Sequence, residues 1–263
     1  MFNIKNNVLE MAVCEKAAEV HVLNKKGEDY NYIWCGEPAF WAGRNPILFP
    51  QVCSNSDKTL KISGIKYQTG NHGFARNQIF SLIDQKDDEL TLGIKENEET
   101  LKQYPFKFSL TINYKLVNNT VELTYTIKNN DNKDMPFGFG LHPAFACKHD
   151  YDGVKCVFNK NEEEFGSELE INKALFEKYP TVIIREPKAD KCTLITGIDN
   201  RKVSIDYPGY NIFAIWSKGD WVCLEPWFTR SPDDPEVDLF DQKGIIVLKP
   251  NEEKVIKTRW TIE

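Results

Sequence analysis

One histidine in this chain stands where an imidazole could transfer protons. His142 lies in the segment 135–147, which reads Met-Pro-Phe-Gly-Phe-Gly-Leu-His-Pro-Ala-Phe-Ala-Cys. Pro143 fixes the backbone directly after it and restricts His142 to extended geometry. An imidazole held stiffly beside a hydrophobic layer suits a general acid, because its pKa lies near neutrality. The same features also describe a core histidine whose hydrogen bonds are satisfied within the fold.

A carboxylate in an equally unusual setting occurs later in the sequence. Glu225 ends the apolar part of the run Trp221-Val-Cys-Leu-Glu-Pro-Trp-Phe, at a point where that run predicts burial. Burying a carboxylate costs free energy unless the group is hydrogen-bonded or used. Glu225 is therefore a candidate general base, and the alternative is a structural ion pair with an arginine.

Two glycine-containing loops carry further polar candidates. Arg44 lies in the stretch 41–51, where it is surrounded by prolines and aromatic residues, and could clamp a polar ligand. A lone arginine in a loop is also an ordinary surface group. His72 and Arg76 lie in the stretch 69–77, which is a second irregular connection.

The elements that must position these residues are strands. Apolar residues alternate with polar ones along Phe106–Leu116 and again along Val121–Ile127, which predicts a long antiparallel hairpin with one buried face. Short helices are expected at Glu96–Gln103 and around Lys173–Lys178. Further strands are expected at Val8–Val13, Ala18–Leu23, Tyr30–Trp34, Leu60–Ile62, Ile65–Tyr67, Gln78–Ile83, Glu89–Ile94, Thr181–Arg185, Cys192–Thr196, Val203–Tyr207, Asn211–Trp216 and Trp221–Glu225.

The end of the sequence predicts one more hairpin, Gly244–Leu248 with Lys254–Ile262. Many strands, almost no helix, no repeat and no linker predict an all-β fold. We expect a single domain over residues 1–263, built as a large antiparallel β-sandwich with few short helices.

Composition excludes several classes of function. A formal net charge of −6 argues against a nucleic-acid interface and against adhesion to anionic membranes. No apolar run approaches a membrane span, and the start lacks the apolar core of a signal peptide. The seven cysteines are scattered through apolar stretches without zinc spacing, which predicts reduced thiols and no metal. We expect a cytoplasmic protein, a monomer or weak dimer.

Four short motifs together resemble a known family. Arg44-Asn-Pro-Ile-Leu-Phe-Pro, Asn71-His-Gly-Phe-Ala-Arg, Gly140-Leu-His-Pro-Ala-Phe and Cys223-Leu-Glu-Pro-Trp-Phe occur in the order seen in aldose 1-epimerases. The resemblance to these galactose mutarotase-like proteins spans nearly the whole chain. It is strongest to the branch related to bacterial lactose-operon-associated epimerase-like proteins.

The resemblance implies a fold, a reaction and roles for residues. The fold would be the galactose mutarotase-like supersandwich, with a sugar bound in a cleft on one sheet. His142 would be the general acid and Glu225 the general base of ring opening, without cofactor or metal. Arg44 and His72 would bind the sugar, and we expect Arg76 and Trp227 to contribute to substrate binding as well. If the acid and base are close together, each favours the charged form of the other, which predicts a protonated His142 and an ionised Glu225.

One departure from the family pattern affects substrate recognition. The family's sugar-binding aspartate is expected on the strand after the acidic segment, where this chain has Pro180 and Thr181. Asp199 and Asp206 are the nearest alternatives. A carbohydrate-binding protein with weak catalysis is therefore an alternative to an enzyme for free aldohexoses. A hexose-6-phosphate 1-epimerase is a second alternative, since Arg44 and Arg76 could both lie near the cleft and bind a phosphate. Four aromatic residues favour the neutral sugar by stacking on it: Trp41, Phe74, Phe145 and Trp227.

Overall fold

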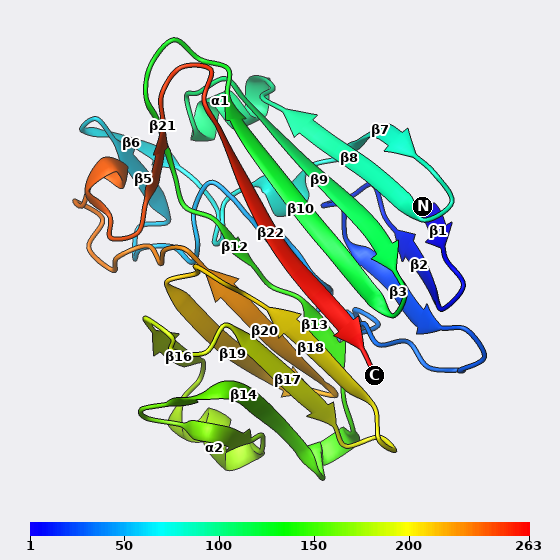
Figure 1. Cartoon of the computed structure of the whole chain (residues 1–263). Helices are drawn as coiled ribbons and strands as arrows, with labels where there is room; N and C mark the ends of the chain where they lie inside the picture. The colour runs from blue at the N-terminus through cyan, green and yellow to red at the C-terminus, as the bar shows by residue number, and fades with distance from the viewer.

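Two large antiparallel sheets face one another in this protein (Figure 1). A computed structural model describes all residues, 1–263. The larger sheet has nine strands. In spatial order they are β15 (Gly166–Glu170), β14 (Val154–Glu162), β17 (Lys191–Thr196), β18 (Lys202–Asp206), β22 (Glu253–Ile262), β10 (Thr120–Asn129), β9 (Phe108–Val117), β8 (Glu89–Lys95) and β7 (Ser81–Gln85).

The second sheet carries the candidate catalytic residues. Its six strands are β16 (Val182–Arg185), β19 (Ile212–Gly219), β20 (Trp221–Trp227), β12 (Gly140–Leu141), β4 (Ile47–Leu48) and β13 (Ala144–Ala146). The first five pair in that order, and β13 joins β20 beyond the end of β12.

Smaller elements close the edges of the sandwich. They are the sheet of β1 (Phe2–Lys5), β2 (Leu9–Val13) and β3 (Val20–Lys25), the pairs β5 (Thr59–Ile62) with β6 (Ile65–Gln68) and β11 (Met135–Phe137) with β21 (Ile246–Leu248), the helices α1 (Glu98–Gln103) and α2 (Lys173–Lys178), and the 3-10 turns η1 (Ala75–Asn77), η2 (His149–Tyr151) and η3 (Leu239–Asp241). No helix has the length and hydropathy needed to cross a bilayer.

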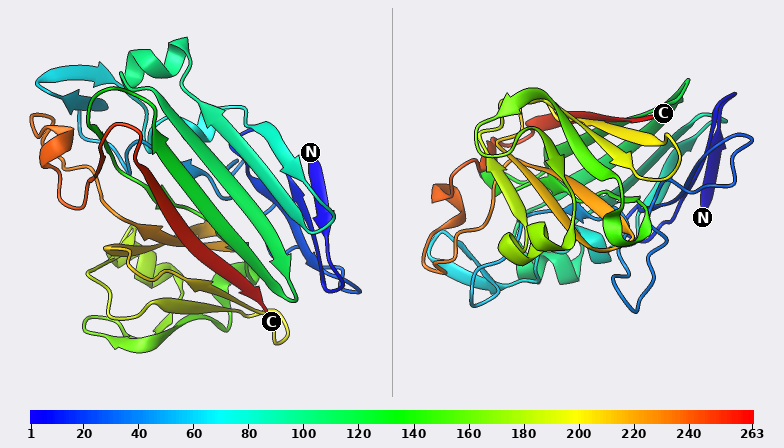
Figure 2. Two further views of the ribbon diagram at one scale, coloured as in Figure 1. Left: turned by 45° about the horizontal axis from the view of Figure 1, so that its top comes forward. Right: turned by 90° about the horizontal axis from the view of Figure 1, so that it is seen from below.

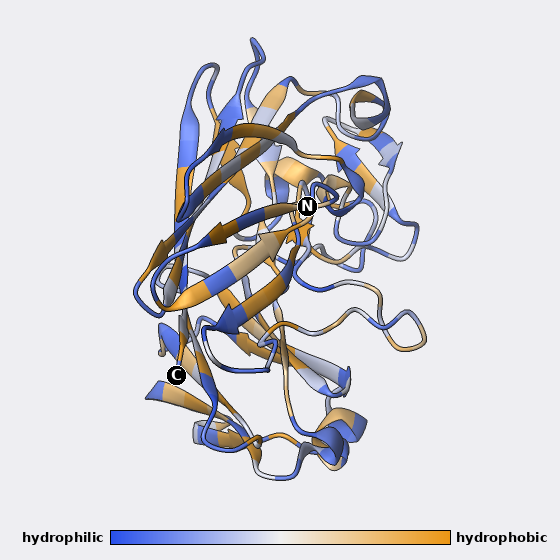
Figure 3. Cartoon of the chain, turned by 90° about the vertical axis from the view of Figure 1, so that its right-hand side faces the viewer, coloured by the Kyte–Doolittle hydropathy of each residue, from blue (hydrophilic) through white to orange (hydrophobic).

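The alternation along β9 and β10 determines which face of the nine-stranded sheet is buried. Every second residue of β9 from Phe108 to Leu116 is buried, and β10 continues the pattern. Figure 3 shows hydrophilic and hydrophobic residues alternating along the strands. The buried faces of the two sheets meet, and the view from below in Figure 2 shows them as separate layers.

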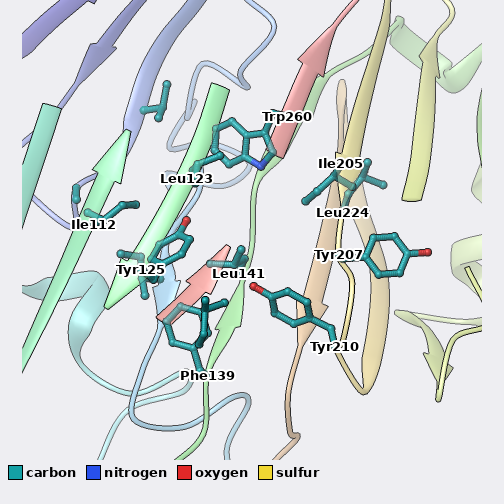
Figure 4. Close-up of a cluster of buried hydrophobic side chains, with 14 of the residues drawn as sticks. Ile112, Leu123, Tyr125, Phe139, Leu141, Ile205, Tyr207, Tyr210, Leu224 and Trp260 are labelled. Atoms are coloured by element: carbon teal, nitrogen blue, oxygen red, sulfur yellow. The ribbon is translucent and has the colours of Figure 1, made fainter. Parts of the chain in front are cut away.

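The core between the sheets is one cluster of 60 buried residues. Figure 4 shows Leu141 of β12 beside Tyr125 of β10, and Leu224 of β20 beside Ile205 of β18. The core therefore supports the strands that carry His142 and Glu225 from behind. All seven cysteines are free, and four of them are buried.

Two expectations about elements were wrong. Tyr30–Trp34 forms no strand and contributes one isolated bridge, from Ile33 to Phe145. The last two strands do not pair with each other, because β21 joins β11 whereas β22 lies between β10 and β18. The sequence analysis also missed seven strands, which are β1, β4, β11, β12, β13, β14 and β15.

Candidate active site

His142 lies directly across from Glu225 in the six-stranded sheet. Gly140 pairs with Trp227, and Ala144 pairs with Cys223, so the residue midway between faces Glu225. The ladder is interrupted there because Pro143 has no N–H to donate. Its carbonyl still accepts from the Leu224 N–H at 3.1 Å, which keeps the two strands in register.

The alternation of β20 decides which of its side chains point away from the core. Val222 and Leu224 belong to the main core cluster. The odd-numbered residues therefore project from the opposite face, since successive side chains of a strand alternate. That face presents Trp221, Cys223, Glu225 and Trp227.

The two candidate catalytic groups meet on this face. Nε2 of His142 lies 3.3 Å from Oε2 of Glu225, and the residues are 7% and 1% exposed. Nδ1 of His142 and Oε2 of Glu225 are buried without a hydrogen-bond partner. Buried polar atoms are nearly always hydrogen-bonded, so these two atoms are candidates for contact with a ligand.

Burial favours the neutral form of both groups. It lowers the pKa of His142 well below the ordinary 6.5, and the neighbouring His72 and Arg76 lower it further. Burial raises the pKa of Glu225 well above the ordinary 4.5, opposed in part by the indole N–H of Trp227. Desolvation therefore opposes the expected imidazolium–carboxylate pair in the substrate-free protein. An imidazole and a carboxylic acid still hold one proton between them.

His72 lies against His142, with ring centroids 5.6 Å apart. Its Nδ1 accepts from the Cys53 N–H at 2.9 Å, so the neutral ring carries its proton on Nε2. Burial, with the charge of Arg76, lowers the pKa of His72 to about 4. Gly73 permits this loop, since a Cβ there would lie 2.2 Å from the Phe49 carbonyl oxygen. His72 is therefore a fixed neutral donor beside the pair.

Tryptophans form the other walls around His142. The ring of Trp41 lies 4.9 Å from the imidazole, and that of Trp216 lies 5.7 Å from it. Trp41 belongs to the loop 35–44 and is held there by the Trp34 indole N–H, which donates to its carbonyl at 2.8 Å. Indole faces at this position suit the C–H face of a pyranose.

The two candidate arginines are placed differently. The Arg44 guanidinium donates to the Cys35 carbonyl and makes no hydrogen bond or ion pair with His142 or Glu225. Arg76 is half-buried in η1, makes no hydrogen bond or ion pair, and lowers the pKa of both histidines. Arg76 rather than Arg44 is thus the cation whose charge acts on the site.

Three of the four aromatic residues expected to stack on a sugar are buried. Phe74 and Phe145 lie inside the main core, so the expectation was wrong for both. Trp227 is 2% exposed and packs with Leu48, Val52 and neighbours. The indole N–H of Trp227 makes no hydrogen bond of normal geometry, but it is close enough to Glu225 to lower the pKa of that carboxyl. The sequence analysis did not predict that Trp216 lies near His142 or that Trp34 holds the loop of Trp41. Both contacts join segments that are distant in the sequence.

Neither alternative aspartate lies with the pair. Asp199 pairs with Arg201, and Asp206 of β18 pairs with Arg259 in the nine-stranded sheet. The row that contains Glu225 continues through Ala214 to Ile183 of β16, which are both apolar.

One cluster of side chains has the spacing of a metal site. Donor atoms of His142, Cys223 and Glu225 lie within 4.8 Å of one another. Burial raises the pKa of the Cys223 thiol well above its ordinary value, and the Glu225 charge raises it further. A protonated thiol is a poor zinc ligand, so the residues do not fit a metal well.

Comparison with known proteins gives the family. The sequence profile described as Aldose 1-epimerase matches residues 2–259. The chain belongs to the aldose 1-epimerase family. Among curated relatives, the chromosomal Protein LacX of Lactococcus lactis subsp. lactis is 26% identical, and the match covers 91% of each chain.

Solved structures agree with this membership in the aldose 1-epimerase family. A galactose mutarotase-like protein from Lactobacillus casei ATCC 334 superimposes with a TM-score of 0.92 at 26% identity, over 100% of both chains. A galactose mutarotase related enzyme from Lactobacillus acidophilus gives 0.91 at 27% identity, over 100% of this chain and 97% of the other. The all-β sandwich with few short helices, expected from the sequence, is confirmed.

Proposed function

We propose that this protein is an aldose 1-epimerase that interconverts the α and β anomers of a free aldohexose. The observation that carries the proposal is the placement of His142 opposite Glu225, with Nε2 and Oε2 3.3 Å apart and both residues buried. Mutarotation needs one group that gives a proton and one that takes a proton, within reach of neighbouring oxygens of one sugar.

The proposed reaction uses the single proton of the pair. His142 gives a proton to the ring oxygen while Glu225 takes the proton of the anomeric hydroxyl. The C1–O5 bond breaks, C1 becomes an aldehyde, and rotation about C1–C2 precedes reclosure with both transfers reversed. In the substrate-free protein burial leaves this proton on Glu225. Sugar hydroxyls that bond to the carboxylate favour its ionised form, and the proton then passes to His142.

Other residues would hold the sugar in this orientation. His72 donates from Nε2, and Trp41 and Trp216 offer indole faces beside the pair. Holding a substrate in reactive geometry is itself a large part of catalysis. Without an aspartate in the row of Ile183 and Ala214, hydroxyl recognition is weak, and we expect a high KM and broad specificity.

Arg76 supports a second candidate, a hexose-6-phosphate 1-epimerase. Its guanidinium has no carboxylate partner and lies near both histidines, as a phosphate site would require. Polarimetry on α-D-galactose, α-D-glucose and α-D-glucose 6-phosphate separates the two. We expect turnover of the free sugars. Strong preference for the phosphate, lost in Arg76→Ala, would establish the second candidate, and no turnover of any sugar would leave a binding protein.

A further inference from the structure

A small pocket at the edge of the six-stranded sheet carries an excess of positive charge. Its volume is about 170 Å³, and it lies where the ends of β16 and β19 meet the segment that follows β20. Figure 1 shows β16 at the edge of this sheet, beside β19. The charged residues of the lining are Arg185, Arg230, Lys243 and Glu186. This local excess of cations is opposite in sign to the formal net charge of the chain, which is −6.

Arg185 lies on the same face of the sheet as Glu225. Val182 and Ile184 of β16 belong to the main core. The side chains of a strand alternate between its two faces, so Ile183 and Arg185 project from the face opposite to the core. Ile183 accordingly packs against the small apolar cluster on the Glu225 side of the sheet. Arg185 therefore points to the side where the sugar of the proposed reaction lies.

Ile212 connects the pocket to the candidate active site. It lines the pocket and pairs with Trp227, which lies two residues beyond Glu225 on the same face of β20. Arg185 pairs with Ile212 from the other side. Two strand spacings and two residues along the strand separate Arg185 from Glu225, which puts their Cα atoms roughly 12 Å apart. One hexose and the long side chain of an arginine together span such a distance.

Arg230 connects the pocket to a second wall of the site. Burial raises the pKa of the Cys53 thiol to about 11, whereas Arg230 lowers it and Glu225 raises it further. Cys53 is therefore close enough to both charged groups to feel them. Its backbone N–H also donates to Nδ1 of His72. The pocket thus borders the loop that holds His72, as well as the strand that holds Glu225.

Arg185 is the one cation of the pocket that has no partner. Lys243 pairs with Glu186 at 2.7 Å, and Arg230 pairs with Asp233 at 3.0 Å. The exposed guanidinium of Arg185 makes no hydrogen bond or ion pair. One guanidinium can hold one carboxylate through two parallel N–H···O bonds. A dianionic phosphate would need a second unpaired cation, so the pocket suits a carboxylate better.

We propose that Arg185 is a specificity-determining residue, which binds the carboxylate of a hexuronate whose C1 lies at His142 and Glu225. The inference rests on the proposed function and extends its substrate range to acidic sugars. A hexuronate is an aldose that carries a carboxylate at C6, so C1, O1 and O5 stay free for ring opening. Its ring would lie over the apolar floor formed by Ala214 and Ile212, and its carboxylate would accept two hydrogen bonds from Arg185.

Binding of methyl glycosides tests this subsite separately from catalysis, because such glycosides cannot open their rings. An NMR titration would compare methyl β-D-glucuronoside with methyl β-D-glucoside. We expect the wild type to bind the glucuronoside roughly tenfold more tightly, and Arg185→Ala to bind the two ligands alike. Arg259→Ala is the matched control, since it removes an exposed arginine from the nine-stranded sheet, and it should keep the preference.

The outcomes separate this subsite from the proposed enzyme activity. Equal affinities of the wild type for the two glycosides, or the same preference in Arg185→Ala and Arg259→Ala, would overturn the subsite. Tighter binding of methyl β-D-glucoside 6-phosphate than of the glucuronoside would overturn the assignment to a carboxylate. A preference for the glucuronoside in a protein that mutarotates no sugar would retain the subsite and refute the enzyme activity. Because Arg185 is exposed, Arg185→Ala is expected to fold normally.

Discussion

Glu225 of β20 lies opposite His142, which lies between β12 and β13, and the side-chain atoms Oε2 of Glu225 and Nδ1 of His142 make no hydrogen bond. The strand pairs Gly140–Trp227 and Ala144–Cys223 on either side fix this relationship. It therefore depends on the backbone register of the sheet rather than on flexible side chains. Such a pair carries one proton and can exchange it with two oxygens of one ligand.

The resting position of that proton can be observed directly. Because burial raises the pKa of Glu225 and lowers that of His142, we expect a protonated carboxyl at neutral pH in the substrate-free protein. The infrared difference spectrum between wild type and Glu225→Gln should contain a carboxylic-acid C=O band. A carboxylate band in its place would show that Glu225 is ionised, and that the attraction between the two charges exceeds the cost of burying them.

His72 should make the protein sensitive to acid. The unfolded imidazole has a pKa of 6.5, whereas the folded one has a pKa of about 4. Above pH 6.5 neither state is protonated; as the pH falls below 6.5, the unfolded chain gains a proton that the folded chain cannot accept, and stability decreases until about pH 4. This loss is about 3 kcal/mol in full.

His72→Asn should remove that loss while raising KM. Asparagine tolerates the positive φ of position 72 and keeps an acceptor for the Cys53 N–H. Urea unfolding at pH 7 and pH 4 measures the difference. His149→Asn is the control, since the pKa of that exposed histidine is raised by Asp220 and the sign is reversed. Equal acid sensitivity of His72→Asn and wild type would refute the buried neutral state.

We expect Trp227 to act mainly by lowering the pKa of Glu225, and not by stacking on the sugar. Gly140 leaves room for its indole, since a Cβ there would lie 2.7 Å from Cδ1 of Trp227. Trp227→Phe removes the N–H that lowers the pKa of Glu225. We expect the carboxyl to titrate at higher pH and kcat to fall roughly tenfold, with little change in KM.

The pH dependence of mutarotation measures this effect. Trp260→Phe is the matched control, because that indole is buried in the core away from Glu225 and its N–H is also unpartnered. If Trp227→Phe lowers only the melting temperature and leaves the pH profile in place, the indole is purely structural.

Chelation should not affect activity. Burial raises the pKa of the Cys223 thiol, which disfavours the thiolate that a metal would need in this three-residue cluster. Mutarotation rates before and after dialysis against EDTA should agree within error. Activity lost on dialysis and restored by zinc, but not restored in Cys223→Ala, would require a metal in the mechanism.

Much of the fold could be predicted from the sequence because local patterns encode it. The alternation in β9 and β10 gave both strands and their pairing, and the motifs identified His142, Glu225 and His72. The partners of β22 could not be predicted, since β10 and β18 lie far from it in sequence and each on a different side. The approach of Trp216 to His142 depends on the same kind of long-range pairing.

Two features of the site could not be predicted for a different reason. The protonation of the pair depends on how deeply both groups are buried, which no motif states. The sequence favoured Arg44 as the arginine of the site, whereas the charge of Arg76 acts on the site. The reason is that the Arg44 guanidinium donates a hydrogen bond to the Cys35 carbonyl. Both are consequences of three-dimensional packing.

The central claim is that His142 and Glu225 move the protons of mutarotation. Polarimetry on freshly dissolved α-D-galactose and α-D-glucose measures it, with His142→Asn, Glu225→Gln and the surface control His149→Asn compared with wild type. We predict that each of the first two lowers kcat by roughly a hundred- to ten-thousandfold, that the control does not, and that circular dichroism is unchanged. A folded His142→Asn or Glu225→Gln variant with a rate near that of wild type would contradict the claim.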